Sequence, residues 1–263
     1  MPTRAPDKPP GRLDTRTTWK YTAALGGVTL LLLIALGSLV TGTMRADAIA
    51  RGQQFAAAVE SQFAHAVSAA HATAALVKHR AERAGTVPAH IEDFERFAEN
   101  IVGQVRGVHA LELAPDGIIR QVYPLAGNER ALGIDLLAEE SQREEALKAI
   151  RERSPTIAGP LQLRQGGVGA VVRLTIFTNG RTARERFWGF AIVLVYIDKL
   201  LDQAGISYLA GGDMHYRLAS PVTPGGAPMV IAASRTGGFT SPVRVAVTPP
   251  NGEWTLELEP SEG

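Results

Sequence analysis

The feature that most constrains this chain is an apolar run close to its N-terminus. From Tyr21 to Met44 the sequence holds 24 residues without a charged side chain, and Lys20 and Arg45 flank them. An α-helix needs about 20 apolar residues to cross the hydrocarbon core of a bilayer. The run is therefore predicted to form a single transmembrane helix, which makes the membrane the first predicted partner of the chain.

The charges on either side of the apolar run predict its orientation. Only Arg45 and Arg51 follow it closely, whereas five basic residues precede it: Arg4, Lys8, Arg12, Arg16 and Lys20. Because basic residues stay on the cytoplasmic side, the N-terminus is predicted to be cytoplasmic and the chain from about residue 45 periplasmic, at a bacterial inner membrane. Residues 1–20, with four prolines in the first ten, are expected to be a disordered tail.

A cleaved signal peptide is the alternative interpretation of the apolar run. Ala46-Asp47-Ala48 resembles a cleavage site, but the run is longer than the signal-peptide core of about 7–15 residues. Both interpretations place the rest of the chain outside the cytoplasm.

Composition limits the chemistry expected of this extracytoplasmic part. Lys plus Arg number 27 and Asp plus Glu 26, so the net charge of +1 argues against a general nucleic-acid binder. The chain has no cysteine, which removes disulfides, thiolate metal sites and cysteine nucleophiles. Neither G-x-S-x-G nor H-E-x-x-H occurs. We therefore expect no enzyme, no cofactor and no metal site.

A long helix is predicted directly after the membrane segment. Residues 46–83 contain no proline and one glycine, Gly52. Apolar side chains recur there every three or four residues as one stripe: Phe55, Val59, Phe63, Ala66, Ala70, Ala74 and Val77. Such a stripe must be covered either by the following domain or by a second copy of the helix, so a stalk over 45–85 and a homodimer through it are predicted.

The remaining sequence alternates between helical and strand patterns. Ala114-Pro115-Asp116-Gly117 separates two runs of period two and predicts a β-hairpin over 108–123. The other predicted strands are 159–164, 168–177, 187–196, 215–219, 228–233, 243–247 and 254–259, and the predicted helices are 91–105, 139–153 and 197–203. The predicted fold class is α+β with antiparallel sheets, in a larger module over 88–203 and a smaller, β-rich one over 204–260.

Five segments of this body stand in a recognisable order: VHALELAPDG (108–117), QVYPLAGNERALGIDL (121–136), REEALKAI (143–150), GPLQLRQGGVG (159–169) and FWGFAIVLVYIDKLL (187–201). Together they resemble the CHASE domain, the extracytoplasmic sensor module of bacterial histidine kinases and diguanylate cyclases and of plant cytokinin receptors. The resemblance covers about residues 45–260. It implies a stalk carrying distal and proximal PAS-like modules, and small-molecule sensing, usually by a dimer.

The resemblance also implies where a ligand binds. In the cytokinin-receptor branch an acidic side chain on the helix after the GID-like element reads an adenine ring, and the matching position here is Gln142. Two further pocket positions fall on Arg164 and Arg173. Because arginines suit a carboxylate or phosphate, an anionic ligand in the distal module is predicted. Tyr123 and Gly189 complete the predicted ligand-binding set.

Each of these residues also has a structural interpretation. Arg164 and Arg173 face solvent if their strands are half-buried, since Arg173 stands between Val172 and Leu174. In the structural interpretation, Tyr123 ends a strand and Gly189 allows a close approach of two backbones.

Two questions about the whole chain stay open at this stage. A protein-interaction or dimerisation module without a small ligand is the rival function. Members of the family continue into a second transmembrane helix and an output domain, so the 263 residues are expected to be part of a longer receptor, with a stand-alone sensor as the alternative.

Overall fold

The computed structural model describes residues 15–84, 88–163, 166–179, 185–209, 214–221, 229–250 and 252–261. The chain divides into two compact units, Met1–Asp47 and Ala48–Gly263. Helix α1 (Thr15–Ala84) contributes residues to both. Most of the predicted tail and the predicted site residue Arg164 lie outside the described residues.

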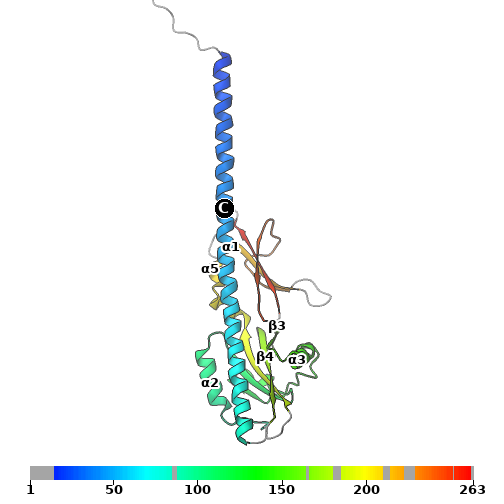
Figure 1. Ribbon diagram of the computed structural model, residues 1–263. Helices are drawn as coiled ribbons and strands as arrows, with labels where there is room; N and C mark the ends of the chain where they lie inside the picture. Colours follow the sequence, from blue (N-terminus) through cyan, green and yellow to red (C-terminus); the bar gives the residue numbers. More distant parts are fainter. Residues whose placement is uncertain are drawn as a thin grey trace, which may run out of the picture. The chain divides into compact units, whose positions relative to one another are not determined.

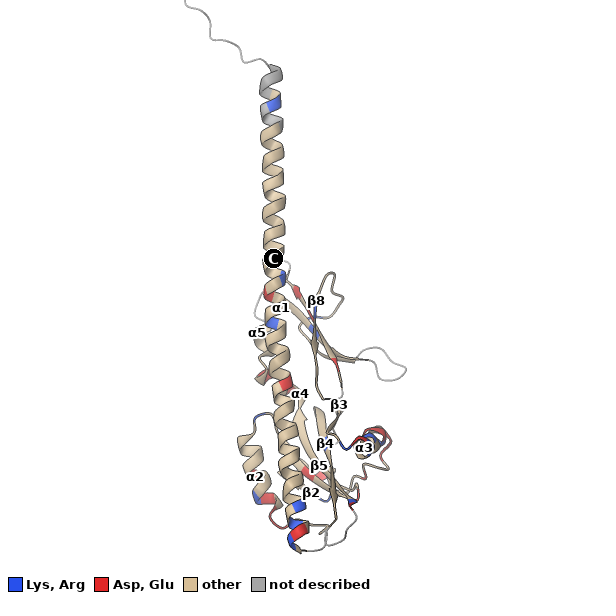
Figure 2. Ribbon diagram, in the orientation of Figure 1, with Lys and Arg blue, Asp and Glu red and all other residues tan. Residues whose placement is uncertain are grey.

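The N-terminal unit contains the apolar part of α1. Figure 2 shows a long stretch of this helix without a charged side chain. Its large apolar residues are exposed, among them Leu30 to Leu33 and Leu36. By length and composition, α1 is able to cross a membrane. The burial of so many exposed leucines in lipid is the favourable outcome expected for such a segment.

The second unit contains two antiparallel sheets, as the α+β prediction required. One has five strands in the order β2-β1-β5-β4-β3, and the other has four in the order β7-β6-β9-β8. The strands of the first are β1 (Ala110–Pro115), β2 (Gln121–Tyr123), β3 (Thr156–Gln162), β4 (Val168–Thr178) and β5 (Arg186–Tyr196). The strands of the second are β6 (Met214–Ser220), β7 (Met229–Ala233), β8 (Val243–Val247) and β9 (Trp254–Pro260). The helical elements are α2 (Phe94–Gln104), η1 (Glu129–Ala131), α3 (Glu140–Glu152), α4 (Ile197–Gln203) and α5 (Ile206–Leu209).

The two faces of the five-stranded sheet are covered by different helices. Figure 1 shows α1 and α2 beside one face and α3 beside the other. The predicted stripe of α1, from Phe55 to Val77, is buried in a continuous core with the first face and with the four-stranded sheet. Phe63 meets Trp254 of β9 edge to face, with ring centroids 5.4 Å apart. The following domain therefore covers the stripe of this helix.

Because both faces are covered, the central strands do not alternate between apolar and polar residues. β4 and β5 are buried along most of their length. Long, nearly continuous apolar runs are typical of strands buried on both faces. A polar side chain in such a strand is therefore informative, because its burial costs free energy unless it has a hydrogen-bond or charge partner.

Most predicted elements match the structure within a few residues. β3 begins at Thr156, three residues before the predicted start at Gly159, and α2 begins at Phe94, three residues after the predicted start at Ile91. Gly159 and Pro160 lie inside β3, where its pairing with β4 shifts register between Ala158 and Leu161. The predicted module boundaries, 88–203 and 204–260, stay predictions.

Candidate ligand-binding site

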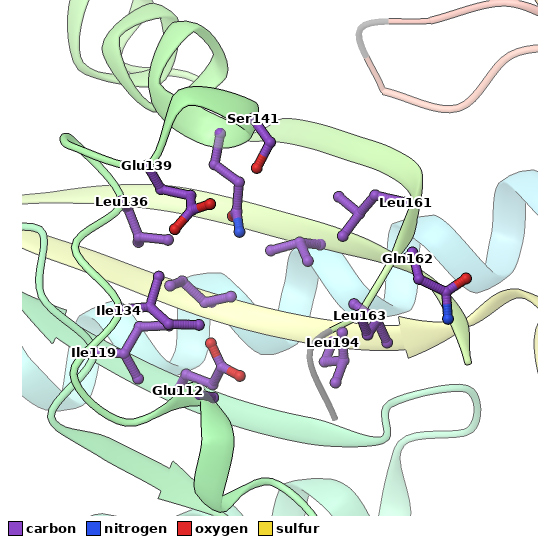
Figure 3. Close-up of a pocket in the computed structure, with 14 residues that line it drawn as sticks. Glu112, Ile119, Ile134, Leu136, Glu139, Ser141, Leu161, Gln162, Leu163 and Leu194 are labelled. Atoms are coloured by element: carbon purple, nitrogen blue, oxygen red, sulfur yellow. The ribbon is translucent and has the colours of Figure 1, made fainter. Parts of the chain in front are cut away.

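A cavity of about 440 Å³ lies on the α3-facing side of the five-stranded sheet. Figure 3 shows its wall of aliphatic side chains with a few polar groups among them. The lining residues are Glu112, Ile119, Ala131, Ile134, Leu136, Glu139, Ser141, Gln142, Leu161, Gln162, Leu163, Val171, Ile192 and Leu194. Its size and its largely apolar lining are those of a small-molecule site.

The strands place their side chains in this cavity by simple alternation. On β1, Leu111 and Leu113 enter the core with α1, so that Glu112 between them points to the opposite face. On β4 and β5 the same alternation brings Val171, Ile192 and Leu194 to the cavity. The floor of the site is therefore fixed by rigid sheet.

The opposite wall is a loop held by local hydrogen bonds. The backbone of Ile119 pairs with that of Ile134 at 3.0 Å. The carboxylate of Asp135 accepts hydrogen bonds from the backbone N–H groups of Leu137 and Ala138 at 2.9 and 3.1 Å. Asp side chains stabilise turns in this way. The turn leads into α3, whose first residues, Ser141 and Gln142, close the cavity.

Glu112 is the least expected group in the cavity. Its side chain is buried, with 5% of the residue exposed. Within the described part of the chain no hydrogen bond to its carboxyl group is found. Burial raises the pKa of Glu112 to about 7, although the positive charge of Arg173 acts in the opposite direction. The carboxyl group thus exchanges its proton near neutral pH.

Arg173 lies behind the cavity wall on the same face of the sheet. It is fully buried, at 0% exposed, and its Nη2 donates a 2.8 Å hydrogen bond to Oε1 of Gln142. Its Nε and Nη1 and the hydroxyl of the opposite residue Thr156 have no hydrogen-bond partner among the described residues. Burial lowers the pKa of Arg173 to about 10, while Glu112 and Glu145 act to raise it. The guanidinium therefore stays charged at neutral pH with part of its donor capacity unused.

The structure brings together only some of the residues that the sequence predicted. Gln142 lines the cavity and holds Arg173, which is not itself a lining residue. The solvent-facing alternative for Arg173 is wrong, because α3 covers the face of β4 on which it lies. Tyr123 packs into the core on the α1 side of the sheet.

Gly189 is required by the backbone geometry of β5. Its φ is +151°, and a Cβ atom there would collide with the carbonyl oxygen of Ala114 on the neighbouring strand. It stands at an irregularity where β4 and β5 shift register between Ile176 and Phe177. Only glycine permits this close approach, and a role of Gly189 or Tyr123 in binding stays a prediction.

Sequence reasoning missed Glu112. The available signal was a single charged residue inside the strand sequence HALELAP, flanked at i−2 and i+2 by the alanines Ala110 and Ala114. A charge on a face with such small neighbours is expected to border a space and not a packed core.

Comparisons with known proteins agree with this architecture. A family model described as the CHASE domain matches residues 46–227. An extracellular ligand-binding receptor from Desulfohalobium retbaense has a similar structure, with a TM-score of 0.59 at 13% identity. That match covers 79% of this chain but only 39% of the receptor chain. No curated protein matches the sequence.

Two chemoreceptor structures are also similar. A methyl-accepting chemotaxis protein X has a TM-score of 0.54 at 15% identity, with 84% of this chain and 99% of that chain covered. The sensory domain of the Campylobacter jejuni chemoreceptor Tlp3 has a TM-score of 0.54 at 12% identity, with coverages of 85% and 96%. At these identities the likeness concerns the fold alone.

The two antiparallel sheets of this chain have the fold of the sensory domains in these structures. The family model covers more than half of the sequence. The chain belongs to the CHASE domain family.

Proposed function

We propose that this chain is the extracytoplasmic ligand-sensing region of a membrane signal-transduction receptor, with its ligand in the cavity between the five-stranded sheet and α3. The observation that carries the proposal is a nearly buried carboxyl group, Glu112, facing a cavity of about 440 Å³ without a hydrogen bond from the described residues. Proteins seldom keep a buried polar group unsatisfied unless function requires it. The names of the similar structures, a ligand-binding receptor and chemoreceptor sensory domains, support the same role for this chain.

In this proposal the chain is anchored in the bacterial inner membrane by the apolar part of α1. The N-terminus is cytoplasmic and the sheets are periplasmic, since five basic residues precede the apolar run. A homodimer through the stalk stays a prediction, because the apolar stripe that suggested it packs on the sheets of the same chain. The proposed role is sensory, without catalysis.

The signal passes from the cavity to α1 through the five-stranded sheet. One face of the sheet meets α3 and the cavity, and the other is packed on α1 between Phe55 and Val77. A ligand shifts a two-state equilibrium only by its differential affinity for the two states. A hundredfold difference corresponds to about 2.7 kcal/mol, which is enough for a switch.

An anionic ligand, predicted from Arg164 and Arg173, is one form of this proposal. It is supported by the unused donors of Arg173. Such a ligand must displace the side chain of Gln142, because Gln142 separates Arg173 from the cavity.

A blocked cavity provides the test. Ser141 is exposed and lines the cavity, so Ser141→Trp places an indole in it, while Arg143→Trp adds the same side chain at an exposed position that does not line it. The full chain in lipid nanodiscs is screened by thermal shift against a chemically diverse set of metabolites. A ligand at a hundred times its Kd adds about 2.7 kcal/mol, or about 5–10 °C in Tm for a domain of this size.

The proposal requires a compound that raises the Tm of the wild type and of Arg143→Trp but not of Ser141→Trp. If no compound meets that condition while all three proteins melt cooperatively, the sensor proposal fails. The rival module, which binds a protein and no small molecule, then explains the fold better.

A further inference from the structure

The charged groups that line the cavity in the described part of the chain are all acidic. They are Glu112, from the centre of the sheet, and Glu139, from the turn before α3. Figure 3 shows the two carboxyl groups directed into the same space from opposite walls. Among the described residues, the positive charge that acts on Glu112 is that of Arg173, which is hydrogen-bonded to Gln142 and does not line the cavity.

Most of the remaining wall is hydrocarbon, with Ser141, Gln142 and Gln162 as its uncharged polar residues. Ile119, Ile134 and Leu136 come from the loop that covers the cavity, and Leu194 comes from β5. The apolar part of this wall favours an aromatic or branched aliphatic group, since the removal of apolar surface from water is favourable. The wall offers uncharged donors on Ser141, Gln142 and Gln162 but, among the described lining residues, no cationic group for an anionic head group, whereas Glu112 provides a charged acceptor at one defined point.

We propose that the ligand of this cavity is a small organic amine, whose ammonium group donates to the Glu112 carboxylate while its apolar body packs against Ile119, Ile134 and Leu194. This inference rests on the proposed function, because it assumes that the cavity binds a ligand. It replaces the anionic ligand expected from the arginines with one of the opposite charge.

The immediate surroundings of Glu112 favour this assignment over a neutral head group. Glu139 and Gln142 line the same cavity, Val122 and Ile192 stand opposite Glu112 on β2 and β5, and Arg173 of β4 acts on it through its charge. A cation stabilises the charged form of a carboxyl group that burial otherwise disfavours. A hydrogen bond between two charged groups is also about twice as strong as one between neutral groups.

Three probes with the same aromatic body separate the alternatives: phenethylamine, 2-phenylethanol and 3-phenylpropanoate carry a cationic, a neutral and an anionic head group. Their Kd values are measured by calorimetry at pH 8 on the full chain in nanodiscs, with empty nanodiscs as the blank. We expect the amine to bind at least about tenfold more tightly than the alcohol, as a charged hydrogen bond implies. The carboxylate is expected to bind most weakly.

Two charge-removing variants assign the effect. Glu112→Gln should weaken phenethylamine binding at least about tenfold and leave 2-phenylethanol within about twofold. Glu140→Gln removes one negative charge from an exposed neighbouring position outside the cavity, and should change neither. Ser141→Trp should abolish binding of both.

Each other result overturns the inference. If 3-phenylpropanoate binds most tightly, or if Glu112→Gln binds the amine as the wild type does, the ligand is not an amine held by Glu112. If none of the three probes binds, the inference also fails. In the first two cases, loss of binding in Ser141→Trp preserves the proposed function, whereas binding that persists in Ser141→Trp removes the cavity from both proposals.

Discussion

Two glutamates occupy matching places in the two sheets and have opposite surroundings. Glu112 lies on β1, between β2 and β5, and Glu257 lies on β9, between β6 and β8. Both are nearly buried, at 5% and 7% exposed. Glu257 accepts hydrogen bonds from Nε of Arg217 at 2.7 Å and from Nε of Arg244 at 3.0 Å, whereas no described residue donates to Glu112.

The strand register explains this difference. Arg217 and Arg244 stand directly opposite Glu257 on its two neighbouring strands. The residues opposite Glu112 are Val122 and Ile192, and Arg173 lies on the far side of Ile192. Two strand spacings, about 9.5 Å, therefore separate the backbones of Glu112 and Arg173. The buried carboxylate of the four-stranded sheet is thus paired within its sheet, whereas that of the five-stranded sheet has no hydrogen bond from the described residues and is available to the proposed ligand.

The largest expected effect is a dependence of stability on pH that comes from Glu112. Because its pKa of about 7 in the folded chain lies above the ordinary value of 4.5, the folded state holds a proton that the unfolded state releases between these values. Stability should thus fall as pH rises from about 4.5 to 7, by about 3 kcal/mol at about 1.4 kcal/mol per pH unit. Urea unfolding followed by the fluorescence of the buried Trp188 and Trp254 measures it.

Glu112→Gln is expected to remove this fall, so that the difference between variant and wild type isolates Glu112 from other titrating groups. Glu257→Gln is the matched variant in the other sheet and should keep the fall. If the free energy of unfolding of the wild type changed with pH in parallel with that of Glu112→Gln, the claim that Glu112 is buried with a raised pKa would be contradicted.

The next largest effect concerns the ion pairs of Glu257. Arg217→Met leaves this carboxylate with Arg244, whose side chain is 68% exposed. We expect a loss of about 2 kcal/mol in the free energy of unfolding, below the range for a fully buried pair because Arg217 is partly exposed. Arg244→Met should cost less than 1 kcal/mol, roughly the value of an exposed pair. Equal losses in urea unfolding would show that the two arginines do not differ as their exposure indicates.

Arg173→Met tests the longer-range coupling in the five-stranded sheet. Removal of the positive charge that opposes the effect of burial should move the midpoint of the Glu112-dependent stability change above pH 7. The energetic effect is expected to be about 1.7 kcal/mol, since the charges interact across about two strand spacings at an effective dielectric constant near 20. A midpoint that stays in place or falls would mean that Arg173 does not act on Glu112.

Arg96→Ala should have the smallest effect. Its side chain is 78% exposed and pairs with Asp93 across 3.2 Å, outside both sheets. An exposed pair of this kind is worth about 0.5 kcal/mol or less. A larger loss in urea unfolding would remove the contrast between exposed and buried pairs on which the comparison depends.

Local patterns predicted most of the elements of this fold. The charge-free run of residues 21–44, the stripe from Phe55 to Val77 and the turn Pro115-Asp116-Gly117 each indicate one structure through near neighbours in the sequence. The strand order β2-β1-β5-β4-β3 could not be obtained in this way, because β1 and β5 pair across about 80 residues.

The candidate site was predicted only in part for the same reason. Gln142 was found through a family resemblance. The burial of Arg173 could not be predicted, because it depends on whether a helix covers its face of β4. Alternation along β4 places Arg173 on the other face of the strand from Val172 and Leu174. Because α3 covers that face, Arg173 lies in the core and not in solvent. Glu112 had a local signal in its neighbours Ala110 and Ala114, but its place at a cavity depends on the same packing of α3.

The most direct test of the account is the titration of the Glu112 carboxyl group itself. Side-chain carbon NMR of the full chain labelled with [δ-¹³C]glutamate, with Glu112→Gln to assign the resonance, gives its midpoint with and without phenethylamine. We expect a midpoint near pH 7 for the free protein, and a lower midpoint with the amine bound, because a cation favours the ionised form. A Glu112 resonance that titrates near 4.5, or one that the amine leaves unchanged, would contradict the claim that this carboxyl group is kept for a ligand.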